Sequence, residues 1–92
     1  MKYFEWDKNK NEWLSEERGV CFDDFVNMLE AKEFLDIVDH PNQDRYPNQK
    51  MFVVIMNDYA YLIPFVEDKE KFFLKTIIPS RKATKEYLTK KK

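Results

Sequence analysis

The sequence predicts a single α+β domain over residues 1–92, in which two N-terminal helices pack on a four- to five-stranded, mainly antiparallel sheet with a C-terminal helix. Three observations predict this class. Apolar residues recur at helical spacing only near the two ends of the chain. Between them lie consecutive short apolar runs with links too short for parallel crossovers, so an antiparallel meander with the helices on one face is expected. Eight Phe, five Tyr and two Trp supply the apolar surface for one small core.

A predicted strand and a predicted helix with two marked ends open the chain. Tyr3–Trp6 alternates large apolar and polar residues, which is typical of a strand. Asp7 then offers a helix N-cap before the polar stretch 8–18. Gly19, the only glycine, stands where a helix C-cap needs a left-handed residue. We therefore expect a surface helix over residues 8–18.

One apolar stripe predicts the second helix. Asp23 and Asp24 suit its first turn, because the positive end of the helix dipole favours acidic residues. Cys21 stands about where a capping serine is usual, and we interpret it as a small, half-buried residue. The stripe, at positions i, i+3, i+4 and i+7, consists of Phe22, Phe25, Val26 and Leu29.

Four further strands are expected over residues 35–39, 51–56, 59–66 and 72–78. The first two are joined by a polar loop, residues 40–49, that is rich in turn-forming proline and asparagine. Asn57-Asp58 is a two-residue hairpin turn. Pro64 has no amide hydrogen for a strand ladder, so we expect an edge or a bulge there, and Pro79 is expected to end the last strand.

A final helix is predicted from Arg81 to about Thr89, capped by Ser80. The last three lysines, residues 90–92, are expected to fray. The side chains expected to face the sheet are Ala83, Tyr87 and Leu88.

Charge is spread unevenly along the chain. Residues 81–92 carry a formal charge of +5, and residues 1–80 carry −6. Such asymmetry is typical of a polyanion-binding tail. It is equally typical of a solvated helix end, where cations lie near the negative end of the dipole. Charge alone leaves both interpretations open.

Several classes of protein are disfavoured. The charged N-terminus lacks a signal-peptide core, and no apolar run approaches the roughly 20 residues that span a bilayer. A lone Cys21 forms no internal disulfide, so a reducing, cytoplasmic setting without a membrane partner is expected. One glycine, one histidine and no G-x-S-x-G segment argue against phosphate-cradling loops, zinc sites and nucleophile elbows. We expect neither a metal nor another cofactor.

The remaining residues suit metal-free RNA cleavage, which needs a base, an acid and cations around the phosphorane. Arg81 lies where a strand meets a helix start, and Ser80 and free N–H groups there favour an anion. Lys75 precedes Arg81 by six residues, so both side chains are expected on one face of an extended segment. His40 is a further candidate because histidine is the usual side chain for proton transfer, although a lone histidine is also an ordinary capping or surface residue.

Several short motifs occur in a recognisable order. The chain contains Phe4-Glu5-Trp6-Asp7-x-x-Lys10-Asn11, then Arg18-Gly19-Val20-x-Phe22, a helix, and a strand that leads to a loop with His40 and Arg45. It closes on Ile77-Ile78-Pro79-Ser80-Arg81-Lys82-Ala83-Thr84. Together these segments resemble the BrnT toxin family, whose closing segment reads Ile-Ile-Ser-Ala-Arg-x-Ala-Thr.

The resemblance implies a fold like that of the RelE ribonuclease toxins. It also implies the toxin of a type II toxin–antitoxin system, a metal-independent endoribonuclease that acts on RNA. The implied partner is a protein antitoxin that neutralises the toxin in a tight complex, and operator DNA is bound only through that antitoxin. By motif, Arg81 is the carried-over basic residue, and His40 and Arg45 match the loop.

The candidate site follows from these two lines of reasoning. Candidate catalytic residues are Arg81, Lys75 and His40, and candidate RNA-binding residues are Arg45, Lys50, Ser80, Lys82 and Lys85. Arg45 and Lys50 have the alternative interpretation of ordinary solvated charges. Two other functions stay open: a non-enzymatic protein-interaction module of the same fold, and an RNA- or DNA-binding protein that uses the basic C-terminal helix.

Overall fold

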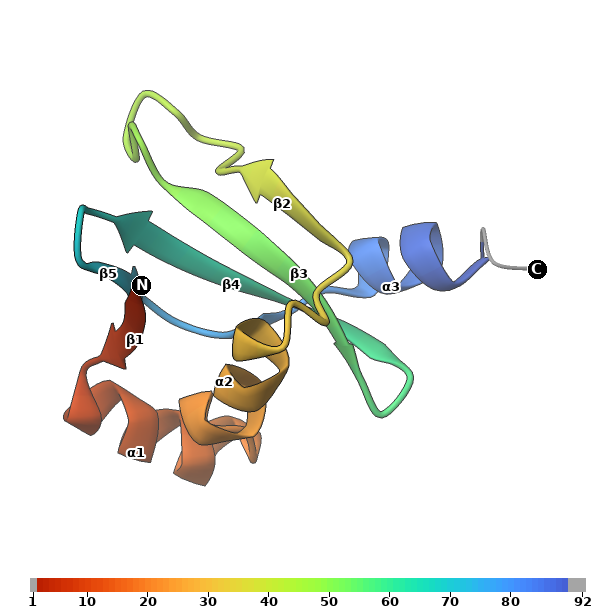
Figure 1. The fold of residues 1–92 in the computed structure, drawn as a ribbon. Coiled ribbons are helices and arrows are strands. Elements are labelled where there is room, and N and C mark those ends of the chain that lie inside the picture. Colours follow the sequence, from red (N-terminus) through yellow and green to blue (C-terminus); the bar gives the residue numbers. More distant parts are fainter. Residues whose placement is uncertain (1, 90–92) are drawn as a thin grey trace.

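The computed structural model describes residues 2–89 and has helices at both ends of the chain with a sheet between them (Figure 1). The predicted α+β class is confirmed. Lys90 to Lys92, expected to fray, lie outside the described residues. In chain order the elements are β1 (Tyr3–Trp6), α1 (Lys8–Arg18), α2 (Phe22–Glu30), β2 (Asp36–Asp39), β3 (Lys50–Met56), β4 (Tyr59–Glu67), β5 (Lys71–Leu74), β6 (Ile78–Pro79) and α3 (Arg81–Thr89).

Helix α1 begins and ends, and helix α2 begins, where the local signals predict. The Asp7 carboxylate accepts a hydrogen bond from the Lys10 amide at 3.0 Å, and Gly19 adopts a left-handed φ of 69° after α1. At the start of α2 the Asp24 carboxylate accepts from the Cys21 amide at 3.2 Å. No helix among residues 2–89 is long and apolar enough to cross a membrane.

The sheet has six strands, one or two more than predicted, and its pairing is mainly antiparallel. Its order is β1-β5-β4-β3-β2, with β6 also paired to β4. The mainly antiparallel pairing predicted from the sequence is confirmed, and the exception is at one edge, where β1 pairs parallel to β5. The pairing sets Phe4 beside Phe72 and Trp6 beside Leu74, so the strand contributes two aromatic side chains to the core. The helices α1 and α2 provide the long connection that a parallel pair needs.

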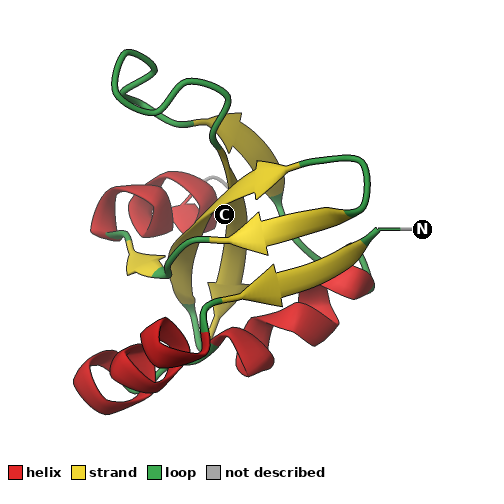
Figure 2. Cartoon of the chain, turned by 90° about the vertical axis from the view of Figure 1, so that its left-hand side faces the viewer, coloured by secondary structure: helices red, strands yellow, loops and turns green. Residues whose placement is uncertain are grey.

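Helices cover both faces of this sheet, which corrects the expectation of one covered face (Figure 2). Phe52, Val54 and Ile63 belong to the core cluster beneath α2 together with Phe25. The alternate residues Met51, Val53 and Leu62 line a pocket with Ala83 of α3. Because successive side chains of a strand point to opposite faces, α3 packs on the face opposite α2. We call these two sides the α2 face and the α3 face.

The last predicted strand is interrupted, and this explains Pro64. Residues 75–77 form no regular strand, and they oppose only residues 63 and 64 between the β5 and β6 pairings. Pro64 is therefore in a central strand and not at an edge. Its carbonyl accepts from the Lys75 amide at 2.8 Å, so its side that lacks an N–H faces this irregular segment.

The predicted hairpin turn and the predicted strand end at Pro79 have different outcomes. Asn57 and Asp58 form the predicted two-residue hairpin between β3 and β4, and both have positive φ values of 54° and 62°. This is the backbone of a type I′ turn, which asparagine and aspartate tolerate. Pro79 does not end the strand before it, because it pairs with Tyr61 as part of β6.

Candidate functional site

One hydroxyl group caps the start of α3, and a second hydroxyl group together with a backbone amide holds it on strand β4. The Ser80 hydroxyl accepts from the Ala83 amide at 3.1 Å, which confirms the predicted cap. The Thr84 hydroxyl donates to the Ser80 carbonyl at 2.7 Å and accepts from the amide of buried Ala60 at 2.8 Å. The Ser80 amide donates to the Ala60 carbonyl at 2.9 Å. Ser80, expected to bind RNA, therefore first positions the helix, and Thr84 is a positioning residue that sequence reasoning did not single out.

Thr84→Val is expected to lower the free energy of unfolding by about 1–3 kcal/mol, because the Ala60 amide is left buried without its acceptor. The substitution keeps the size and branching of the side chain. Thr76→Val is the matched control, since half-buried Thr76 makes no side-chain hydrogen bond within residues 2–89. Urea denaturation of both variants measures the difference. Equal midpoints would show that the Thr84 hydroxyl does not hold α3 in place.

A pocket of about 290 Å³ joins the start of α3 to the end of β2. One wall carries Ser80 and Lys82, and the other carries Asp39 and Pro41, the two neighbours of His40. Two chain segments about 40 residues apart, each singled out from the sequence, thus meet here. Arg81 and Lys85 lie on α3 with exposed side chains.

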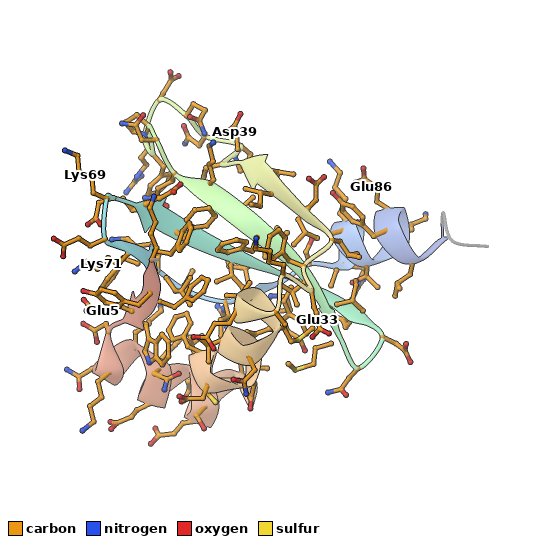
Figure 3. The ribbon with its side chains drawn as sticks, viewed as in Figure 1. Glu5, Glu33, Asp39, Lys69, Lys71 and Glu86 are labelled. Carbon is orange, nitrogen blue, oxygen red and sulfur yellow. The ribbon has the colours of Figure 1, made fainter. Side chains whose placement is uncertain are left out.

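One carboxylate in this pocket was not considered from the sequence. Asp39 of β2 and Glu86 of α3 both line the pocket, and Figure 3 labels them on these elements. Asp39 pairs with Lys50, so its side chain belongs to the α2 face, and Glu86 provides the carboxylate on the α3 face. Glu86 follows Lys82 by four residues, so the two side chains lie on one face of the helix. The signal was present as a Lys-x-x-x-Glu spacing, but it is common in surface helices and indicates a site only once the pocket is known.

His40 has a structural role in the loop that it opens. Its Nδ1 accepts from the Asn42 amide at 3.1 Å, and its carbonyl accepts from the Gln43 side-chain amide at 2.6 Å. Its ring lies 4.4 Å from the Tyr46 ring, centroid to centroid. Because Nδ1 accepts a hydrogen bond, the neutral ring carries its proton on Nε2. His40 can therefore present a donor at Nε2, but not a base at that nitrogen.

Arg45 and Lys50, two further predicted RNA-binding residues, lie in different parts of the structure. Arg45 is exposed, with its guanidinium carbon 5.7 Å from the centre of the Tyr46 ring. Lys50 begins β3 and alternates with Met51, so its side chain belongs to the α2 face. The structure therefore does not bring Lys50 together with Ser80 and Lys82 on one face of the sheet, and RNA binding by Lys50 stays a prediction. The face of a strand residue depends on register, which the loop sequence did not specify.

Lys75 lies on the α3 face, although the continuous strand expected between it and Arg81 is absent. Its exposed side chain places Nζ 5.4 Å from the centre of the Phe73 ring. Phe73 alternates with Phe72 and Leu74, both of which pack into the core on the α2 face. Lys75 thus lies on the same side of the sheet as α3.

Arg18 is a second positioning residue that sequence reasoning left without a role. Its guanidinium donates to the carbonyl of buried Ile77 at 2.6 Å, and it lies 5.3 Å from the Trp13 ring. The contact ties the end of α1 to the irregular segment that leads to Arg81. The sequence signal was the Arg18-Gly19 pair within the family motif, which marks a helix end but not its distant acceptor.

Tyr87 closes the far end of the pocket on Asp36. The phenol donates to the Asp36 carboxylate at 3.1 Å. Burial, then the hydrogen bond to Asp36, raises the pKa of Tyr87 above its ordinary value. The folded state therefore holds this proton more tightly than the unfolded state does. The resulting stability is fully present below about pH 10 and is lost as the pH rises through the folded pKa of Tyr87.

Tyr87→Phe is therefore expected to flatten the alkaline decline in stability. The wild-type protein should lose free energy of unfolding above about pH 10 more steeply than the variant. Denaturation midpoints measured from neutral to alkaline pH give the comparison. Parallel decline in both proteins would mean that the Tyr87 proton is not linked to folding.

The α2 face carries a larger, aromatic pocket of about 810 Å³. Its floor includes Phe4, Phe34, Phe52 and Phe72, and their rings contact one another at 5.1–6.1 Å. Exposed Ile37 lies at its rim, and Tyr3 adjoins it from the sheet edge with its side chain directed to the α3 face. Sequence reasoning assigned no function to this surface, because its residues come from β1, α2, β2, β3 and β5.

The chain matches no protein-family model, no curated protein and no solved structure. The resemblance to the BrnT family rests on the sequence motifs. Within the described residues, no three His, Cys, Asp or Glu side chains are grouped closely enough to hold a metal ion.

Proposed function

We propose that the protein is the toxin of a type II toxin–antitoxin system and cleaves RNA without a metal ion. The observation that carries the proposal is the pocket where the start of α3 meets the end of β2. Its two walls are the segments that the family resemblance marks, around Arg81 and around His40. Lys82 and Glu86 line the pocket, and Arg81 and His40 are chain neighbours of its lining residues. A cation, a histidine and a carboxylate are the groups that phosphodiester transfer needs.

Each group has a role in the proposed reaction. The 2′-oxygen of the ribose attacks phosphorus and forms a new P–O bond, while the bond to the 5′-oxygen breaks. Glu86, the carboxylate of the pocket on the α3 face, takes the 2′-hydroxyl proton. Arg81 and Lys75 stabilise the charge on the phosphorane, and the arginine fork binds two of its oxygens. His40 Nε2–H donates a hydrogen bond toward the departing 5′-oxygen, which takes its proton from solvent water, while Glu86 returns its own proton to solvent.

The direct test is cleavage of RNA by protein freed from its antitoxin in the presence of a metal chelator. The toxin and its genomic neighbour are co-expressed, the complex is denatured, and the toxin is refolded alone. We expect RNA cleavage in the chelator, its loss on adding the antitoxin back, and growth arrest when the toxin is expressed alone. Intact RNA together with normal growth would overturn the proposal.

The aromatic pocket favours a second candidate function, a protein-interaction module without catalysis. An apolar, aromatic surface with an exposed hydrophobic residue at its rim is typical of a protein contact. Under this alternative, the partner is the cognate antitoxin or another protein with an apolar anchor, and no RNA is cleaved. Phe34→Ser should then abolish a stable complex in size-exclusion chromatography while Arg81→Ala leaves it intact. A partner that binds Phe34→Ser as tightly as wild type would contradict this use of the pocket.

A further inference from the structure

Strand β5 and the residue that follows it present a phenylalanine between two lysines on the α3 face. Lys71 and Phe73 alternate with the core residues Phe72 and Leu74, and Lys75 is the first residue after the strand. The two lysine Nζ atoms lie 6.0 Å and 5.4 Å from the centre of the Phe73 ring. Tyr3, the β1 residue paired with Lys71, is 49% exposed. We call Tyr3, Lys71, Phe73 and Lys75 the aromatic–lysine strip.

The two lysines differ in how they are held. Lys71 Nζ lies 3.0 Å from the Glu5 carboxylate of the neighbouring strand, as Figure 3 labels them, and this hydrogen bond raises the pKa of Lys71. Neither of the two ion pairs found within the described residues involves Lys75. One cation of the strip is therefore fixed at the sheet edge, while the other has no carboxylate partner and remains available to an anion.

The strip leads to the candidate site. The Lys75 amide donates to the Pro64 carbonyl, and the chain runs from there through β6 directly into Ser80 and Arg81. The helix α3 packs against β4 and lines its pocket with residues of β2, β3 and β4, whereas β1 and β5 contribute no residue to that pocket. An aromatic surface with cations thus lies beside the proposed centre and on the same sheet face.

We propose that the aromatic–lysine strip binds single-stranded RNA next to the cleavage site, and this rests on the proposed function for the identity of the polyanion. Bases stack on exposed Tyr3 and half-buried Phe73, and a flanking phosphate binds Lys75. A sheet surface that presents aromatic rings suits unpaired bases, because their faces are open, whereas a duplex hides them. The strand from Lys71 to Leu74 spans about 10 Å, which is room for more than one nucleotide.

The test is binding of a fluorescently labelled single-stranded RNA, and of the same RNA as a duplex, by the full chain carrying Arg81→Ala. This background prevents cleavage during the titration. We expect preference for the single strand, and a 5- to 100-fold loss of affinity in Tyr3→Leu, as is roughly typical for one stacked base. Tyr3→Phe keeps the ring and should keep the affinity. Lys75→Gln should weaken binding and its salt dependence, whereas Lys69→Gln, the same charge change in the β4–β5 turn, should not.

The outcomes separate this inference from the proposed function. Equal affinity of Tyr3→Leu and Tyr3→Phe, equal affinity for duplex and single strand, or no binding at low salt would contradict RNA binding by the strip. If the wild-type chain cleaves RNA while any of these results is found, the ribonuclease proposal is kept and only RNA binding by the strip is rejected. If RNA binds through the strip but the wild-type chain does not cleave it, the ribonuclease proposal is rejected and RNA binding by the strip is kept. Circular dichroism of each variant establishes that the sheet is intact.

Discussion

Arg81→Ala is expected to lower RNA cleavage by about 100- to 1,000-fold, the usual effect of removing one donor from a charged transition state. Arg81 is the first residue of α3, and its exposed side chain adjoins the pocket lined by Ser80 and Lys82. Within the described residues the Arg81 guanidinium makes no hydrogen bond, ion pair or cation–π contact, so the free energy of unfolding should change little. Cleavage rates under single-turnover conditions measure the effect.

Two further variants make the Arg81 result specific. Arg81→Lys keeps the charge but loses the planar fork, so it should fall between wild type and Arg81→Ala. Lys8→Ala removes an exposed cation from the start of α1 and should leave cleavage unchanged. Growth arrest on expression should follow the same order. Full cleavage by Arg81→Ala, with an unchanged unfolding midpoint, would remove Arg81 from the reaction.

Local sequence signals predicted the elements well, because the groups that decide them are near neighbours. Asp7 and Ser80 each cap a helix through an amide three residues later, and Gly19 ends a helix by its own φ. The stripe from Phe22 to Leu29 predicted one buried side of α2 correctly, with Val26 the half-buried member. None of these depends on where the rest of the chain lies.

Long-range arrangement was predicted less well, because a pattern gives the apolar side of an element but not its partner. The position of Ala83 predicts which side of α3 is buried, but it does not predict which of the two sheet faces that side covers. The parallel pairing of β1 with β5 depends on Phe4 meeting Phe72 across 68 positions of chain. The irregular segment before β6 is held by Arg18, whose target carbonyl no local signal reveals.

The candidate site shows the same division. Ser80 and Arg81 were identified from capping and helix-start chemistry, which are local. Glu86 shares a pocket with the end of β2 only because α3 crosses the α3 face there. Lys50 lies on the other face, because one position of register decides which face a strand side chain takes.

Phe25→Ala is expected to destabilise the fold by about 3–5 kcal/mol, because it removes a fully buried aromatic side chain and leaves a cavity. The Phe25 ring lies under α2 and packs edge-on against Tyr61 of β4, with centroids 5.3 Å apart. A domain of this size has a total stability of about 5–14 kcal/mol. The loss is therefore a large share of the whole, and the melting temperature should fall by roughly 12–40 °C.

The contrast with an exposed apolar residue decides whether α2 is anchored as described. Leu35 is 39% exposed at the entry to β2, so Leu35→Ala should cost less than about 1 kcal/mol. Phe25→Leu keeps most of the volume and should recover more than half of the loss seen in Phe25→Ala. Thermal and urea unfolding of the three variants test this order. If Phe25→Ala unfolds at the same midpoint as Leu35→Ala, then α2 does not pack on the sheet through the contact of Phe25 with Tyr61.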